Sequence, residues 1–101
     1  MKVYSNIQIE RNVILKIKKY MKEIYDSDFD YYIVNHYTNV EDMLHGLINH
    51  HNIKLAELIQ WATEYDSPDE YIDRLVDTLN FGENGDWSII EVDGEYYEVV
   101  I

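Results

Sequence analysis

Two runs of β-forming residues joined by Asp93-Gly94 constrain the fold more than any other feature of this chain. The runs read WSIIEV and EYYEVVI. An Asp-Gly pair between such runs favours a two-residue type I′ turn, because that turn needs positive φ at both central residues. The turn sets a hairpin register with Ile90 opposite Tyr97 on one face and Glu91 opposite Tyr96 on the other. We expect the face with Ile90 and Tyr97 to pack on helices.

Apolar residues at helical spacing precede this hairpin in four places. Thr38 and Glu41 form a T-x-x-E capping box before the second stretch, and Ser67-Pro68 supplies an N-cap and first residue for the fourth. Tyrosine and β-branched residues in YYIVNHY predict a strand before the second helix. A shorter strand is expected within residues 2–9. The predicted helices cover about residues 10–25, 38–51, 53–65 and 68–80.

These elements predict a single α+β domain over residues 1–101, with about four helices packed on a small, mainly antiparallel sheet that ends in a C-terminal β-hairpin. The chain contains no cysteine, which excludes disulfides and thiolate metal sites. No stretch approaches the roughly 20 apolar residues that span a bilayer. We expect a cytoplasmic protein without membrane contact, in the host cytoplasm if a phage encodes it.

The charge is large and unevenly distributed. The net charge is −12, whereas a magnitude of about 2–8 is enough to keep a small domain soluble. Residues 1–22 hold six basic side chains and one acidic one, and the remainder holds nineteen acidic and two basic ones. The sequence therefore predicts a basic first helix on an acidic body. That helix either docks in cis on the body, or presents its lysines to a partner or to a second copy in a homodimer.

Acidic residues of the predicted fourth helix fall away from its apolar stripe, at spacings of three and four that bring neighbouring carboxylates together. Like charges at this spacing destabilise a helix, so the alternatives are a solvated face or an interaction surface. The acids of the hairpin and of the loop at 26–30 add the same charge and favour a surface. Tyrosines are enriched at interfaces, and five of them (Tyr31, Tyr32, Tyr37, Tyr96 and Tyr97) are too many for so small a core. The predicted partner-binding residues are Asp66, Asp69, Glu70, Asp73, Asp77, Glu91, Glu95, Tyr96 and Glu98.

Catalytic and metal sites are not predicted. His45, His50 and His51 do not share a helical face in the i, i+4 manner of metal ligands. The serines lie in no nucleophile-elbow context, and a glycine-rich phosphate loop is missing. The helical pair in NIKLAELIQWATEYDSPDEYIDRL is similar to a helix-turn-helix, but its second helix is acidic where phosphate contact demands lysine or arginine. We therefore expect no enzyme activity, no cofactor and no direct binding of nucleic acid.

Size, charge, lack of cysteine and the α+β pattern together resemble the small acidic counter-defence proteins of phages, the antirestriction and anti-CRISPR inhibitors. The segment YIDRLVDTLNFGENGDWSIIEVDGEYYEVVI is also similar to the end of ArdA-type antirestriction proteins, where acidic helices and a terminal hairpin recur. The resemblance implies an inhibitor that mimics nucleic acid and blocks a basic partner, a nuclease or a CRISPR or restriction effector. The alternative is an immunity or antitoxin protein that neutralises a basic toxin nuclease.

Overall fold

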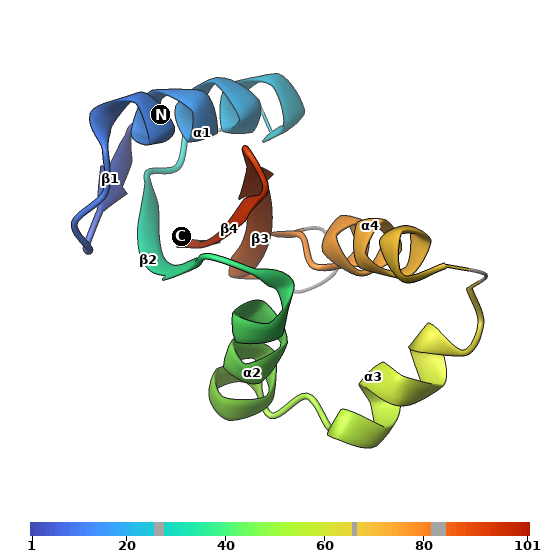
Figure 1. Cartoon of the computed structure of the whole chain (residues 1–101). Helices are drawn as coiled ribbons and strands as arrows, with labels where there is room; N and C mark the ends of the chain where they lie inside the picture. The colour runs from blue at the N-terminus through green and yellow to red at the C-terminus, as the bar shows by residue number, and fades with distance from the viewer. Residues whose placement is uncertain (26–27, 66, 82–84) are drawn as a thin grey trace.

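A four-stranded mixed sheet lies at the centre of the molecule, and helices cover both of its faces (Figure 1). The computed structural model describes residues 1–25, 28–65, 67–81 and 85–101. The strand order is β1-β2-β4-β3, with β1 parallel to β2 and the other neighbours antiparallel. This confirms the predicted α+β class and the C-terminal hairpin. The strands are β1 (Val3–Ser5), β2 (Tyr31–Tyr37), β3 (Trp87–Val92) and β4 (Glu95–Val100).

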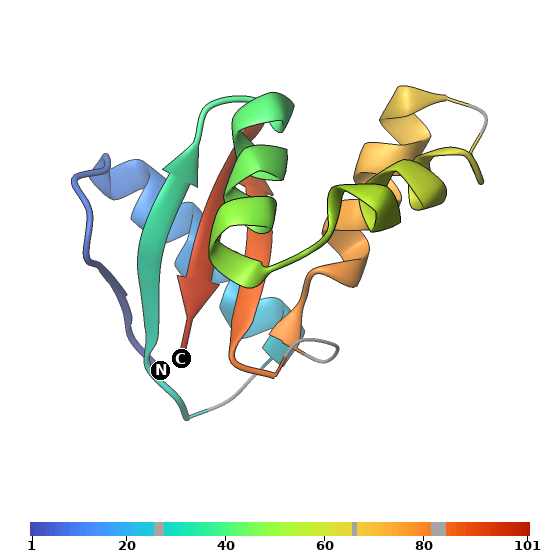
Figure 2. The ribbon, with the colours of Figure 1, turned by 90° about the horizontal axis from the view of Figure 1, so that it is seen from below.

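The helices form two layers on the sheet. Helix α1 (Arg11–Tyr25) lies on one face, while α2 (Val40–His51) and α4 (Pro68–Thr78) lie on the other. Helix α3 (Leu55–Ala62) packs beside α4 rather than on the sheet (Figure 2). In the described ranges, no helix is long and apolar enough to cross a membrane.

Local signals placed the turn and one helix start correctly. Asp93 has φ 52° and Gly94 has φ 82°, as a type I′ turn requires. The register that this turn predicts is observed along the whole hairpin. The side chain of Ser67 accepts a hydrogen bond from the backbone N–H of Glu70 at 3.2 Å and so caps α4 as predicted.

The cap of α2 lies one residue later than predicted. The side chain of Asn39, not of Thr38, accepts a hydrogen bond from the backbone N–H of Asp42 at 2.9 Å. Thr38 instead donates through its hydroxyl to the carboxylate of Asp42 at 3.3 Å. Both residues are good N-caps, so the sequence offered two registers and the T-x-x-E interpretation was wrong.

The hairpin face with Ile90 and Tyr97 packs on helix α1 as predicted, and the opposite face is covered by helices as well. Strand β4 lies between β2 and β3, and helices lie on both faces of this sheet. Tyr97 packs in the core on the α1 side, while Ile89 and Tyr96 pack in the core on the α2 and α4 side. Tyr31, Tyr96 and Tyr97 are therefore core residues, whereas Tyr32 and Tyr37 are only partly buried, in keeping with the prediction that the core cannot hold all five.

Candidate protein-binding surface

One face of α4 carries a row of exposed carboxylates. Asp69, Asp73 and Asp77 follow one another at intervals of four residues and are all exposed. The row points outward because Tyr71 and Leu75, on the opposite side of the helix, are buried. Asp69 in the first turn also interacts favourably with the positive end of the helix dipole, but the two residues that follow are beyond its reach.

Glu91 extends this row from the helix to the edge strand β3. Burial, followed by the carboxylates of Glu91 and Asp73, raises the pKa of Tyr96, so both carboxylates act on the same hydroxyl. Asp77 and Glu91 also line one groove of about 450 Å³ beside β3, to which α1 contributes Tyr20. We name the set Asp69, Asp73, Asp77 and Glu91 the acidic ridge. Glu70 is exposed on the same helix.

Basic side chains do not neutralise the ridge. In the part of the chain that the structure describes, one lysine or arginine forms an ion pair: Nζ of Lys16 lies 2.6 Å from Oδ2 of Asp93. This pair ties α1 to the hairpin turn, and both side chains remain largely exposed. Arg74 lies on α4 itself but lines a cavity on the α3 side, together with Trp61. The lysines at 18, 19 and 22 are exposed, so α1 docks in cis without cancelling the charge of the body.

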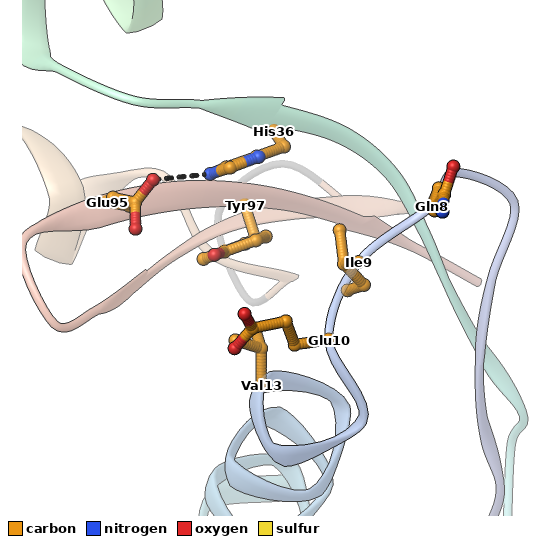
Figure 3. A pocket seen from close by; sticks show the side chains of 7 residues that line it. All are labelled: Gln8, Ile9, Glu10, Val13, His36, Glu95 and Tyr97. Atoms are coloured by element: carbon orange, nitrogen blue, oxygen red, sulfur yellow. Dashed lines mark hydrogen bonds and ion pairs between the residues drawn. The ribbon is translucent and has the colours of Figure 1, made fainter.

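Glu95 lies on the other face of the sheet, apart from the ridge. Its Oε1 is 2.9 Å from Nε2 of His36, and the His36 ring stacks on Tyr97 (Figure 3). Burial raises the pKa of Tyr97, and the carboxylates of Glu95, Asp93 and Glu10 raise it further. The hairpin acids therefore gather in two places, which the single predicted surface did not anticipate.

Tyr96 and Glu98 were predicted to contact a partner, but the structure places both in the interior. Tyr96 is 5% exposed and Glu98 is 4% exposed. The carboxylate of Glu98 accepts a hydrogen bond from Nδ2 of Asn35 at 3.1 Å and contacts Nε2 of His51 at the end of α2. The His51 ring stacks on Trp87 with centroids 3.7 Å apart. Glu98 therefore links α2 to the sheet and is excluded from the binding surface.

Asp66, the remaining predicted residue, lies outside the described residues. Histidine and carboxylate groups that could hold a metal ion do not occur in clusters of three or more within the described ranges. His45 lies 3.8 Å from Glu41 on the exposed side of α2, and His51 contacts Glu98.

Sequence reasoning missed His36 and Glu10 near Glu95. Strand pairing between β2 and β4 places His36 opposite Tyr97, and the start of α1 brings Glu10 to the same cavity. The alternation along β4 does put Glu95 and Tyr97 on one face, which was the one local signal for this site. Comparisons with protein-family models, with curated proteins and with solved structures found no significant match to this chain.

Proposed function

We propose that this chain is a non-enzymatic inhibitor whose acidic ridge binds the nucleic-acid-binding surface of a basic partner protein. One observation carries this proposal. Asp69, Asp73, Asp77 and Glu91 form a continuous exposed row, and no lysine or arginine among the described residues pairs with them.

The spacing of the row supports mimicry of a nucleic-acid strand. Four residues of α-helix rise about 6 Å, so the aspartates repeat a negative charge at an interval comparable with that of successive phosphates. Like charges at i, i+4 destabilise the free helix. Lysines and arginines that are clustered in the groove of a partner also repel one another. Docking places opposite charges together and relieves the repulsion on both surfaces. Long-range attraction also speeds the encounter of oppositely charged surfaces.

The partner in this proposal is a nuclease or a CRISPR or restriction effector, the class of target implied by the resemblance to phage counter-defence proteins. Such a partner has a cationic channel that binds nucleic acid. An acidic ridge on a rigid helix occupies that channel and excludes DNA or RNA by competition.

The decisive experiment compares two variants of equal net charge. The ridge variant carries D69N, D73N, D77N and E91Q, and the control carries E23Q, D28N, E57Q and E64Q at exposed positions away from the ridge. Each serves as bait for proteins of the host lysate, and the captured protein is then titrated with labelled duplex DNA in the presence of each variant. We expect the ridge variant to bind about 100-fold more weakly than the control, which should match the wild type.

Equal binding by the two variants would discard the ridge, and binding that leaves the DNA complex intact would discard mimicry. Binding that is insensitive to salt would also contradict the proposal, because exposed charge pairs are screened. A toxin nuclease as the captured partner would place the chain in the immunity class instead of the counter-defence class.

A further inference from the structure

A second acidic site lies on the α1 side of the sheet, in a cavity of about 620 Å³ between β4 and the start of α1 (Figure 3). Glu95 borders the cavity from the hairpin and Glu10 borders it from the residue before α1. Ile9 and Val13 add apolar surface on the α1 side, and Tyr97 lines the cavity from the sheet. The site thus combines two carboxylates from distant segments with an apolar wall.

Tyr97 supplies the cavity with a hydrogen-bonding group. Its side chain is 3% exposed, and within the described residues its hydroxyl has no hydrogen-bond partner. The ring is held in place by parallel stacking on His36, with centroids 4.5 Å apart. Figure 3 shows the ring between His36 and Glu10. The hydroxyl is not among the fully buried unpartnered atoms of the described residues, so it is open to the cavity that Tyr97 lines. A ligand that enters the cavity therefore meets a hydrogen-bonding group that the stacked ring holds in place.

The charge around Tyr97 selects a cation. Burial raises the pKa of the Tyr97 hydroxyl, and the carboxylates of Glu95, Asp93 and Glu10 raise it further. A phenol is neutral near pH 7 even at the ordinary tyrosine pKa of about 10, so the negative charge of the site comes from the carboxylates. Lys16 already pairs with Asp93. Glu95 contacts His36 through Oε1, at 2.9 Å from Nε2 of the ring, and neither Glu10 nor Glu95 has a lysine or arginine partner in the described ranges. Glu10 and the second carboxylate oxygen of Glu95 are therefore the groups that an incoming cation meets.

We infer that this cavity binds the guanidinium group of an arginine side chain of the basic partner. A guanidinium presents five N–H donors in a plane and can serve Glu10, Glu95 and the Tyr97 oxygen at once, whereas an ammonium group is a compact point charge. Its flat faces can pack on Ile9 and Val13. The inference rests on the proposed function, because it takes the arginine to belong to the protein that the acidic ridge attracts.

The inference is tested on the full chain, labelled with ¹⁵N, by NMR titration with three probes: acetyl-arginine amide, acetyl-lysine amide and free L-arginine. We expect acetyl-arginine amide to shift the signals of the residues that line the cavity, and to bind about threefold more tightly than acetyl-lysine amide. Free L-arginine has the same net charge as the blocked form but adds a hydrated ammonium–carboxylate pair that a side-chain site does not accommodate, so it should bind no more tightly than acetyl-arginine amide. Tighter binding of the free amino acid would assign the cavity to a small molecule and overturn the partner side chain.

Three variants make the test specific. Glu10→Gln and Tyr97→Phe should each weaken acetyl-arginine amide about fivefold, because each removes one hydrogen-bonding group. Glu57→Gln removes a charge from an exposed position on α3 and should leave binding unchanged. Tyr97→Phe keeps the stacked ring, so a dispersed spectrum checks that the fold is intact. Shifts spread over all acidic surfaces, or equal binding by E10Q and E57Q, would overturn the inference.

The two proposals fail separately. If neutralising the ridge abolishes partner binding while acetyl-arginine amide does not bind the cavity, the proposed role of the ridge is supported and the arginine site is contradicted. If the cavity binds acetyl-arginine amide and the ridge variant still binds the partner, the arginine site is supported and the proposed role of the ridge is contradicted.

Discussion

The acidic ridge and Glu98 place the same chemical group in opposite settings. Asp73 and its neighbours point into solvent from a helix whose other side is buried, and nothing in the described chain pairs with them. Glu98 lies in the central strand and is enclosed by Asn35, His51 and the sheet. The carboxylate of Glu98 links α2 to the sheet, whereas the carboxylates of the acidic ridge make no ion pair within the described residues that would stabilise the fold. The acids able to meet a partner are therefore those that the fold does not need.

Removing the Glu98 carboxylate should have the largest effect on stability. Glu98→Ala leaves Asn35 and His51 without their common acceptor in a buried site, and breaking a buried pair in this way costs about 3 kcal/mol. Urea denaturation followed by circular dichroism measures the loss of unfolding free energy. Glu98→Gln keeps an acceptor oxygen and should lose less. A loss for Glu98→Ala below about 1 kcal/mol would show that the link is not structural.

Removing the cap that starts α4 should have a smaller effect. Ser67→Ala deprives the backbone N–H of Glu70 of its acceptor and should lower the unfolding free energy by about 1 kcal/mol. Because the ridge depends on the first turn of α4, amide hydrogen exchange should rise first at residues 69–73. Thr38→Ala offers a comparison, since Asn39 caps α2 and the loss there should be smaller. Equal losses at the two positions would contradict the observed caps.

Neutralising one ridge carboxylate should stabilise the free protein slightly. Asp73 has a like charge four residues away on each side, so Asp73→Asn should raise the unfolding free energy by about 0.5 kcal/mol at low salt. The gain should vanish at high salt, where exposed charges are screened. Asp69→Asn is the control, because it also loses a favourable interaction with the helix dipole. A destabilised Asp73→Asn would mean that this carboxylate serves the fold after all.

The smallest effect expected is on the ionisation of Tyr96. Burial raises its pKa first, and Glu91 and Asp73 raise it further. An unfolded tyrosine titrates near about pH 10, so the unfolded state loses its proton before the native state and stability falls as the pH rises above 10. Glu91→Gln should lower the pKa of Tyr96 and make that fall shallower. NMR titration of tyrosine labelled with ¹³Cζ measures the pKa, and an unchanged value in Glu91→Gln would remove Glu91 from the neighbourhood of Tyr96.

Local chemistry made part of the fold predictable. Asp93-Gly94 sets the hairpin register through its own backbone requirement, and Ser67-Pro68 starts α4 through a side chain and a fixed φ. The burial of both hairpin faces was not predictable in the same way. It requires α1 to pack on one face of the sheet and α2 and α4 on the other. It also requires pairing between β2 and β4, which joins segments about 60 residues apart and leaves no periodic pattern in either.

The same distinction separates the two acidic sites. Asp69, Asp73 and Asp77 share one helix, so their spacing predicted a common face. Glu10, His36 and Glu95 come from three segments, and only the folded chain brings them to one cavity. Glu98 was misassigned because alternation alone cannot tell an exposed face from one that other helices cover.

The central place of β4 has a consequence for synthesis on the ribosome. β4 follows every other described element in the chain, yet it separates β2 from β3 and supplies Tyr96, Tyr97 and Val99 to the two cores. Until it emerges, β3 has no strand to pair with and neither core can close. Translation must therefore pass Val99 before the domain can fold, and a nascent chain stalled before Glu95 exposes unpaired strands to chaperones and proteases.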